Sequence, residues 1–276
     1  MSNALRIAHG PFGRVALLDM DAPLVRHAHP HCHVLIKAEG ADTQFLVRDQ
    51  IAPLTRESAV LINAWESHSY VHDLQRPRTI ILALYIEPVW LGCFRHNWIA
   101  SNAPGFFHQP GVLLPLRVRR LADELAEAMA ARAEAAQERL LSELMIAVIE
   151  RFAAWQAAPS LRDMPRGADP RARRAKMLIQ EDPGAVTNMT ALARRAGLSR
   201  ASLFRLFEQS AGVPPRMFQN VLRLECAVAA LIGGDAPVAG ISADLGFSAP
   251  PHFTRFFRDH AGVTPSEFRA VSRQDL

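Results

Sequence analysis

The sequence LFRLFEQSAGVPPRMF, residues 203–218, returns in pattern fifty residues later as FTRFFRDHAGVTPSEF, residues 253–268, and this repeat indicates the architecture of the C-terminal half. An arginine, a glycine-valine pair, a proline and two phenylalanines recur at identical spacing. Just upstream, Ala196-Gly197-Leu198-Ser199 is echoed by Leu245-Gly246-Phe247-Ser248 at an offset of 49 residues. An internal repeat of this length indicates that one supersecondary unit occurs twice.

Each copy has the pattern of a helix-turn-helix. In the first copy Gly197 takes the turn, because a positive φ is cheap only for glycine. Leu198 plugs the turn, and Ser199 can cap the next helix. Leu203 and Leu206 are expected to bury the inner face of that helix.

The second copy follows the same plan. Gly246 takes the turn, Phe247 plugs it and Ser248 caps the following helix. A helical pattern from Met217 to Ile232 joins the copies, and at about 1.5 Å per residue it can hold two recognition helices about one DNA turn apart, roughly 34 Å. Two plain hairpins in a helical bundle are the alternative, but the matching arginines and the shared tail favour DNA binding. The expected anchors of the second recognition helix are Phe253, Phe256 and Phe257.

From about Ala168 to Ala270 the chain resembles the DNA-binding domain of the AraC/XylS family of bacterial transcription regulators. The residues that carry the resemblance are Arg223-Leu224 with Ala227, Gly246-Phe247-Ser248, Phe253 with Arg255 and Phe257, and Gly262-Val263-Thr264-Pro265 with Phe268-Arg269. The resemblance implies a bipartite DNA-binding domain, usually that of an activator that contacts RNA polymerase. It also assigns the DNA contacts to the recognition helices and their caps, which here carry Arg200, Ala201, Ser202, Phe204, Arg205, Ser248, Pro250, Pro251, Thr254 and Arg255.

Two positions depart from the family pattern. Ser242 stands where the family usually has alanine, a small change that should still pack. Phe204 occupies an outward position that is often polar, so it can contact a thymine methyl group or turn inward. Arg205 and Arg255 can each address a guanine or a phosphate, and the sequence leaves both possibilities open.

The first half of the chain has the pattern of short strands. Many short apolar segments separated by turns are typical of a small barrel or sandwich. Turn or breaker residues separate the segments, among them Asp49-Gln50 and Pro53. The segments are Val15–Leu18, Val34–Lys37, Phe45–Val47, Ala59–Ile62 and Ile80–Ile86.

Two helical patterns follow, over Leu116–Ala130 and Ala135–Trp155. The apolar stripe of the second helix can pack on its own domain or form a dimer seam. The expected fold class is α+β. A cupin-like β-barrel with trailing helices is expected over residues 1–157, a linker over 158–168, and an all-α domain with two helix-turn-helix units over 169–276.

Four histidines of the first half are candidate effector or metal ligands: His27, His29, His33 and His68. Many members of the family have a cupin-like sensory barrel, and the cupin metal pattern begins with His-x-His, as at His27 and His29. In an extended strand residues 27, 29 and 33 share one face, and neutral imidazoles suit Zn, Fe, Ni or Cu. Two alternatives stay open: a pocket for an organic effector that includes some of these histidines, or no special role, since Pro30 can break the strand.

The basic charge is confined to one end of the chain. Residues 169–276 carry 14 Lys and Arg against 10 Asp and Glu, whereas the first 168 residues carry 17 of each. Such a surplus favours a polyanionic partner for the C-terminal half.

The sequence carries no catalytic signature and no membrane span. It has no GxSxG, P-loop or HExxH motif, and its longest apolar stretch, Thr79 to Phe94, is too short to cross a bilayer. Three cysteines without CxxC spacing indicate no disulfide framework. We therefore expect a cytoplasmic homodimer that binds promoter DNA and a small-molecule effector and contacts RNA polymerase. A repressor that acts by shape alone and a metal-dependent cupin enzyme with a fused helical module are the alternatives.

Overall fold

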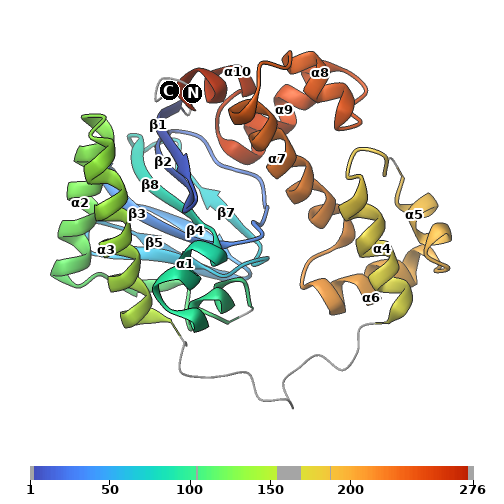
Figure 1. Cartoon of the computed structure of the whole chain (residues 1–276), viewed down its shortest axis with the longest axis horizontal. Coiled ribbons are helices and arrows are strands. Elements are labelled where there is room, and N and C mark those ends of the chain that lie inside the picture. Colours follow the sequence, from blue (N-terminus) through green and yellow to red (C-terminus); the bar gives the residue numbers. More distant parts are fainter. Residues whose placement is uncertain (1–2, 104, 154–168, 187, 273–276) are drawn as a thin grey trace. The chain divides into compact units, whose positions relative to one another are not determined.

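The computed structural model describes residues 3–103, 105–153, 169–186 and 188–272. The chain forms two compact units, a β-rich unit with trailing helices and an entirely helical unit (Figure 1). The predicted α+β organisation is confirmed. The predicted linker, residues 158–168, and the predicted end of the helix at Trp155 lie outside the described residues.

The strands of the β-rich unit form two antiparallel sheets, one with the order β1-β2-β8-β3-β6-β9 and one with the order β5-β4-β7. All five segments predicted as strands lie in β2, β3, β4, β6 and β8. The strands are β1 (Asn3–Gly10), β2 (Gly13–Met20), β3 (Cys32–Gly40), β4 (Thr43–Val47), β5 (Gln50–Leu54), β6 (Ser58–Ile62), β7 (His68–Val71), β8 (Thr79–Ile86) and β9 (Gly111–Leu113).

Strand β5 contradicts the prediction of a break between strands at Gln50 and Pro53. The chain turns before it, where Arg48 has a φ of 53°, and β5 then pairs with β4 in a hairpin. Proline is tolerated here because β5 lies at the edge of its sheet, and an edge position does not require every backbone N–H.

The trailing helices cover one face of the larger sheet. They are α1 (Pro88–Phe94), the 3-10 helix η1 (His96–Asn102), α2 (Leu116–Ala130) and α3 (Glu134–Phe152). Figure 1 shows α2 and α3 side by side along the sheet. Val34 and Ile36 of β3 share a buried core with Leu144 and Val148 of α3. Because side chains alternate along a strand, His33 lies on the opposite face of the sheet.

The apolar stripe of α3 fills this core. The stripe therefore packs on its own domain, and a dimer would have to use other residues. The stripe residues that are no more than 3% exposed are Leu140, Leu141, Leu144, Met145, Val148 and Ile149.

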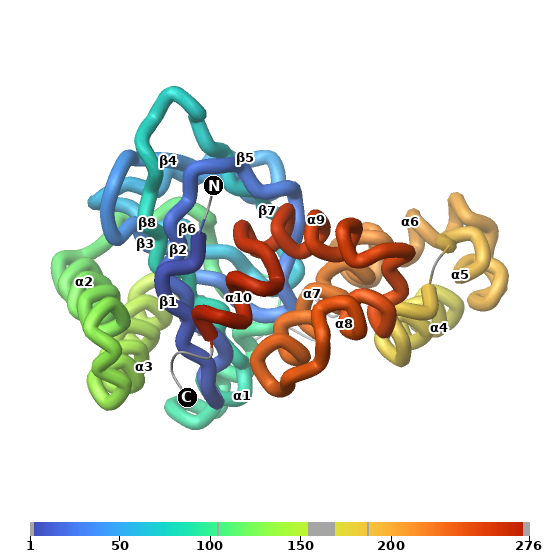
Figure 2. Tube along the Cα trace, turned by 90° about the horizontal axis from the view of Figure 1, so that it is seen from above, coloured from blue at the N-terminus to red at the C-terminus, as the bar shows by residue number. Residues whose placement is uncertain are grey.

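The helical unit repeats itself in space as it does in sequence. Helices α5 and α8 begin 49 residues apart, and α6 and α9 begin 50 residues apart. Figure 2 shows the long helix α7 joining the two copies. No helix in the described part of the chain is long and apolar enough to cross a membrane. The helices are α4 (Pro170–Glu181), α5 (Met189–Arg195), α6 (Arg200–Ala211), α7 (Pro215–Gly233), α8 (Val238–Asp244), α9 (Pro250–Ala261) and α10 (Pro265–Ser272).

The two predicted turns have the same geometry. Gly197 and Gly246 adopt φ values of 73° and 71°. The plug residue of each turn donates its amide back to the preceding helix, Leu198 to the Ala193 carbonyl at 2.8 Å and Phe247 to the Ser242 carbonyl at 3.0 Å. This equivalence confirms both helix-turn-helix units.

The caps of the two recognition helices differ. The Ser199 hydroxyl accepts a hydrogen bond from the Ser202 amide at 3.1 Å, as a helix cap should. The Ser248 hydroxyl instead pairs with Nδ1 of His252 at 2.8 Å. The cap predicted at Ser199 is therefore confirmed. The cap predicted at Ser248 is wrong, because Ser248 lies two residues before the start of α9 at Pro250 and its hydroxyl contacts a side chain and not a backbone amide.

The buried anchors of the recognition helices follow a spacing of four residues. Leu203 and Phe207 of α6 are fully buried, whereas Leu206, predicted to be buried, is only half-buried. Residues four apart share one helix face, so Phe207 takes the place predicted for Leu206. In α9 the same positions are held by Phe253 and Phe257, both fully buried.

The departure at Ser242 leaves a polar atom in the core of the second copy. Its side chain is 1% exposed, and its hydroxyl has no hydrogen-bond partner among the described residues. We expect Ser242→Ala to raise the free energy of unfolding by about 1 kcal/mol, because an unsatisfied buried hydroxyl costs about 1–3 kcal/mol. Urea denaturation of the full chain measures this change.

The matched control for this change is Ser58→Ala in the β-rich unit. Ser58 is 5% exposed, and its hydroxyl donates to the Pro53 carbonyl at 2.8 Å and accepts from the Thr55 amide at 3.0 Å. Losing these bonds should lower stability. A loss of stability in Ser242→Ala would show that its hydroxyl makes a favourable interaction.

Candidate functional site

The predicted DNA contacts lie on the outer surface of α6 and α9. None of the ten is in the core: Ser202, Phe204 and Thr254 are half-buried and the rest are exposed. The Arg200 guanidinium lies 5.7 Å from the centre of the Phe204 ring. Phe204 has therefore not turned into the core, and it lies beside a cation at the surface.

The arginines of the recognition helices differ from those of the β-rich unit in their partners. In the β-rich unit most arginines are paired with carboxylates, as in Arg48–Glu66 at 2.7 Å and Arg139–Glu143 at 2.8 Å. Within the described residues, the arginines of α6 and α9 have no acidic partner. Their guanidinium groups are available to phosphates or base edges. These arginines are Arg200, Arg205, Arg255 and Arg258.

A basic pocket of about 210 Å³ lies between α5, α6 and α7. Three arginines line it, Arg200, Arg216 and Arg223, and no carboxylate is among its lining residues. Burial, and then the charge of Arg216, lower the pKa of the Arg223 guanidinium. The Arg223 guanidinium donates to the Pro183 and Gly184 carbonyls, at 3.1 and 3.4 Å. Sequence reasoning missed this pocket, although Arg223 was part of the family resemblance.

The candidate histidines are brought together by a loop, and not by a strand as predicted. Strand β3 begins only at Cys32, after Pro30, so His27 and His29 belong to the loop between β2 and β3. Two backbone hydrogen bonds of 2.8 Å join His27 to His68, each residue donating to the other. The prediction of one shared strand face is therefore wrong for residues 27 and 29.

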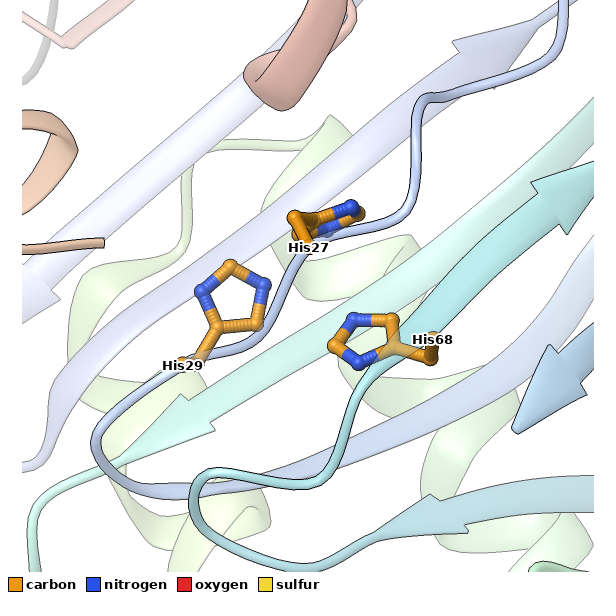
Figure 3. A group of neighbouring side chains, drawn as sticks. All are labelled: His27, His29 and His68. Atoms are coloured by element: carbon orange, nitrogen blue, oxygen red, sulfur yellow. The ribbon is translucent and has the colours of Figure 1, made fainter. Parts of the chain in front are cut away.

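Figure 3 shows the rings of His27, His29 and His68 turned toward one another. The ring centres of His27 and His68 are 4.4 Å apart, and that of His29 is 5.0 and 5.2 Å from them. One nitrogen of each ring lies within 4.8 Å of the other two. The loop and the start of β7 thus assemble a set of three imidazoles.

The imidazoles of His29 and His68, and that of the neighbouring His33, favour the neutral form. Burial lowers the pKa of His68 to about 4. Burial, and then the neighbouring imidazoles, lower the pKa of both His29 and His33 well below the usual range. Near neutral pH these rings therefore carry lone pairs and not charge.

His33 lies beside the three and not among them. Its ring stacks on Tyr85 at 4.1 Å, and its centre is 5.0 Å from His29. The Arg14 guanidinium lies 4.1 Å from the same tyrosine ring. Arg14, Tyr85 and His33 form one row across β2, β8 and β3. Sequence reasoning missed Arg14 and Tyr85, because strand pairing cannot be read from the spacing of residues.

Comparison with known families accounts for both units. The model of the AraC-like ligand binding domain matches residues 21–149, and that of a helix-turn-helix domain matches residues 192–270. The chain belongs to the AraC family of transcription regulators. The resemblance predicted from the repeat is confirmed for the C-terminal half and extends to the N-terminal half.

Several curated AraC-family relatives match this chain in sequence. An uncharacterized HTH-type transcriptional regulator of Haemophilus influenzae is 30% identical over 101 residues, 37% of this chain and 34% of the relative. The activator RclR of Escherichia coli is 33% identical over 94 residues, 34% of this chain and 33% of RclR. These matches span about a third of each relative. The activator RhaR of Yersinia pestis is 25% identical over 256 residues, 89% of this chain and 84% of RhaR.

Solved structures of ToxT from Vibrio cholerae share the AraC-family fold with this chain. One has a TM-score of 0.53 at 14% identity and covers 99% of this chain and 98% of ToxT. A second, with an unsaturated fatty acid bound, has a TM-score of 0.54 at 12% identity and covers 98% and 95%. Both units and their order along the chain are therefore found in ToxT.

Proposed function

We propose that this chain is a transcription regulator that binds promoter DNA sequence-specifically through α6 and α9. The observation that carries the proposal is the duplicated helix-turn-helix, which presents Arg205 and Arg255 at equivalent positions, both exposed and without an acidic partner in the described part of the chain. Arginine reads guanine bidentately in the major groove and also contacts phosphates.

The length of α7 suits this role. Its 19 residues span about 28 Å at 1.5 Å per residue. A spacer of this length lets two recognition helices reach successive major-groove segments, which lie about 34 Å apart. The basic pocket of Arg200, Arg216 and Arg223 is suited to a backbone phosphate, which would fix the protein's register on the duplex.

The β-rich unit is proposed as the sensory half. Effector binding would shift the population of arrangements of the DNA-binding units across residues 158–168. The names of RhaR and RclR as activators support an activating role. We propose that the chain acts as a cytoplasmic homodimer that contacts RNA polymerase. An enzyme built on His27, His29, His33 and His68 would leave the duplicated arginines without a role, so we infer that the chain is not an enzyme.

Selection of DNA fragments tests the proposal. Random genomic fragments are captured on the purified full-length protein at roughly physiological salt and sequenced. We expect one enriched motif with two half-sites about 10–10.5 base pairs apart, centre to centre. Affinity for that motif should fall steeply with salt, as phosphate contacts require. Capture without a shared motif, both as purified and with added Zn²⁺, would contradict sequence-specific binding.

A further inference from the structure

The cluster of His27, His29 and His68 has the features of a built site for a cation. We propose that these three residues bind one divalent transition-metal ion inside the β-rich unit. The proposal deepens the proposed function, on which it rests for the sensory role of this unit, by naming the chemistry of one ligand.

The hydrogen bonds of the cluster set the ring tautomers for metal binding. Nδ1 of His27 lies 2.7 Å from the Val25 carbonyl, and Nδ1 of His68 lies 2.9 Å from the Glu66 carbonyl. A carbonyl only accepts, so each Nδ1 carries the hydrogen and each Nε2 carries a lone pair. Backbone carbonyls orient metal-binding histidines in the same way in known sites.

The three rings are held by backbone contacts that do not depend on their side chains. The reciprocal bonds between His27 and His68 fix two of them, and the Trp65 amide donates to the His29 carbonyl at 2.7 Å. Trp65 itself adopts a φ of 60°, which closes the turn before β7. A ligand set fixed on the backbone needs little reorganisation to bind an ion.

The three side chains are buried. His27, His29 and His68 are 3%, 2% and 0% exposed. Nε2 of His68 has no hydrogen-bond partner among the described residues. A metal–nitrogen bond would satisfy this atom, since a buried polar atom is normally paired.

The donor set points to the class of metal. Three imidazoles suit Zn²⁺, Co²⁺, Ni²⁺ or Cu²⁺, whereas Mg²⁺ and Ca²⁺ prefer oxygen ligands. The nearest carboxylate in sequence, Glu66, is engaged elsewhere, by Arg48 at 2.7 Å and the Asn63 amide at 2.9 Å. Nitrogens around a tetrahedral zinc lie about 3.3 Å apart for bonds of about 2.0–2.1 Å. One nitrogen of each ring lies within 4.8 Å of the other two, so the rings would have to rotate toward a bound ion. Three protein ligands leave one position open for water or for an effector atom.

Metal content and affinity of the full-length protein test the proposal. The protein is stripped with a chelator, titrated with Zn²⁺ against a competing dye, and loaded with Co²⁺ as an optical probe. We expect one ion per chain and the visible absorption bands of tetrahedral Co²⁺. His68→Gln and His29→Gln should each weaken Zn²⁺ binding by at least 100-fold. Loss of a residue that only orients a metal ligand costs up to about 100-fold, and loss of a ligand itself should cost at least as much.

The exposed His108 provides the matched control, because surface histidines bind metals adventitiously. His108→Gln should change the affinity less than threefold, and circular dichroism of every variant checks that it is folded. Wild-type protein that takes up no ion overturns the proposal, and so do folded His29 and His68 variants with unchanged affinity. The readouts separate the two proposals. If the wild-type protein binds operator DNA but no metal, only the metal-site proposal is contradicted. If it binds metal but no operator DNA, only the proposed regulatory function is contradicted.

Discussion

Replacing both Arg205 and Arg255 with alanine is expected to weaken operator binding by roughly 30- to 20,000-fold at constant salt. Each bidentate arginine–guanine contact is worth about 1–3 kcal/mol, and a tenfold change corresponds to about 1.4 kcal/mol. The two residues lie in separate copies of the repeat, so their effects should add. Fluorescence anisotropy with a labelled operator fragment measures the change.

The same measurement at several salt concentrations separates the two possible targets of these arginines. If both contact phosphates, the slope of log K against log salt should flatten by about two, and all sequences should lose affinity alike. If both contact guanines, the slope should change little and the preference for the operator should fall. This distinction settles a question that the sequence leaves open.

The control for the lost charge is the double variant Arg120→Ala, Arg139→Ala. Both arginines lie on helices of the β-rich unit, where they face Glu124 at 3.4 Å and Glu143 at 2.8 Å. This variant loses the same net charge and should keep its operator affinity within about threefold. Operator affinity that survives the change at Arg205 and Arg255 would show that the recognition helices are wrongly assigned.

Gly246→Ala is expected to destabilise the helical unit by about 2–5 kcal/mol, well beyond the effect of Gly197→Ala. Both glycines adopt nearly the same positive φ, 71° and 73°. Alanine at either position would therefore destabilise the backbone by the same amount, about 1–2 kcal/mol. They differ in surroundings. A Cβ at Gly246 would lie 2.2 Å from the Gly184 carbonyl oxygen, whereas at Gly197 the nearest atom is Cδ of Arg171 at 4.0 Å. Relief of such a backbone overlap adds about 1–3 kcal/mol.

Urea denaturation followed by circular dichroism, with hydrogen exchange of the α8 and α9 amides, measures the difference in the full chain. Gly197→Ala serves as the matched control, because Gly197 has nearly the same φ as Gly246 but an added Cβ there would overlap no neighbouring atom. Equal losses in the two variants would mean that the loop at Gly184 does not pack on the second turn. The close approach of Gly184 to Asp244 and Gly246 predicts that the losses differ.

The parts of the structure that the sequence predicted depend on neighbours along the chain. A turn at Gly197 or Gly246 is set by the φ that only glycine adopts cheaply. The outward placement of Arg205 and Arg255 follows from helix periodicity alone. The strands of the β-rich unit were found for the same reason wherever an apolar segment stood between turns.

The errors concern residues whose environment is set by distant parts of the chain. From the sequence Pro53 was predicted to break a strand, but the sheet order places it in β5 at the edge of a sheet, where proline is tolerated. Leu206 and Phe207 are both apolar, and only the packing of α6 decides which of them is buried.

The two helix-turn-helix units and their matching arginines could be predicted from the amino-acid sequence, because that pattern is local and occurs twice. The sequence grouped His68 with His27 and His29 as candidate ligands, but only the folded chain shows how they meet, through backbone pairing of a loop with the start of β7. The tertiary structure also placed Arg14 and Tyr85 beside His33, and Arg216 beside Arg200. These contacts join residues far apart in the chain, and the spacing of residues carries no record of which strands and loops pair.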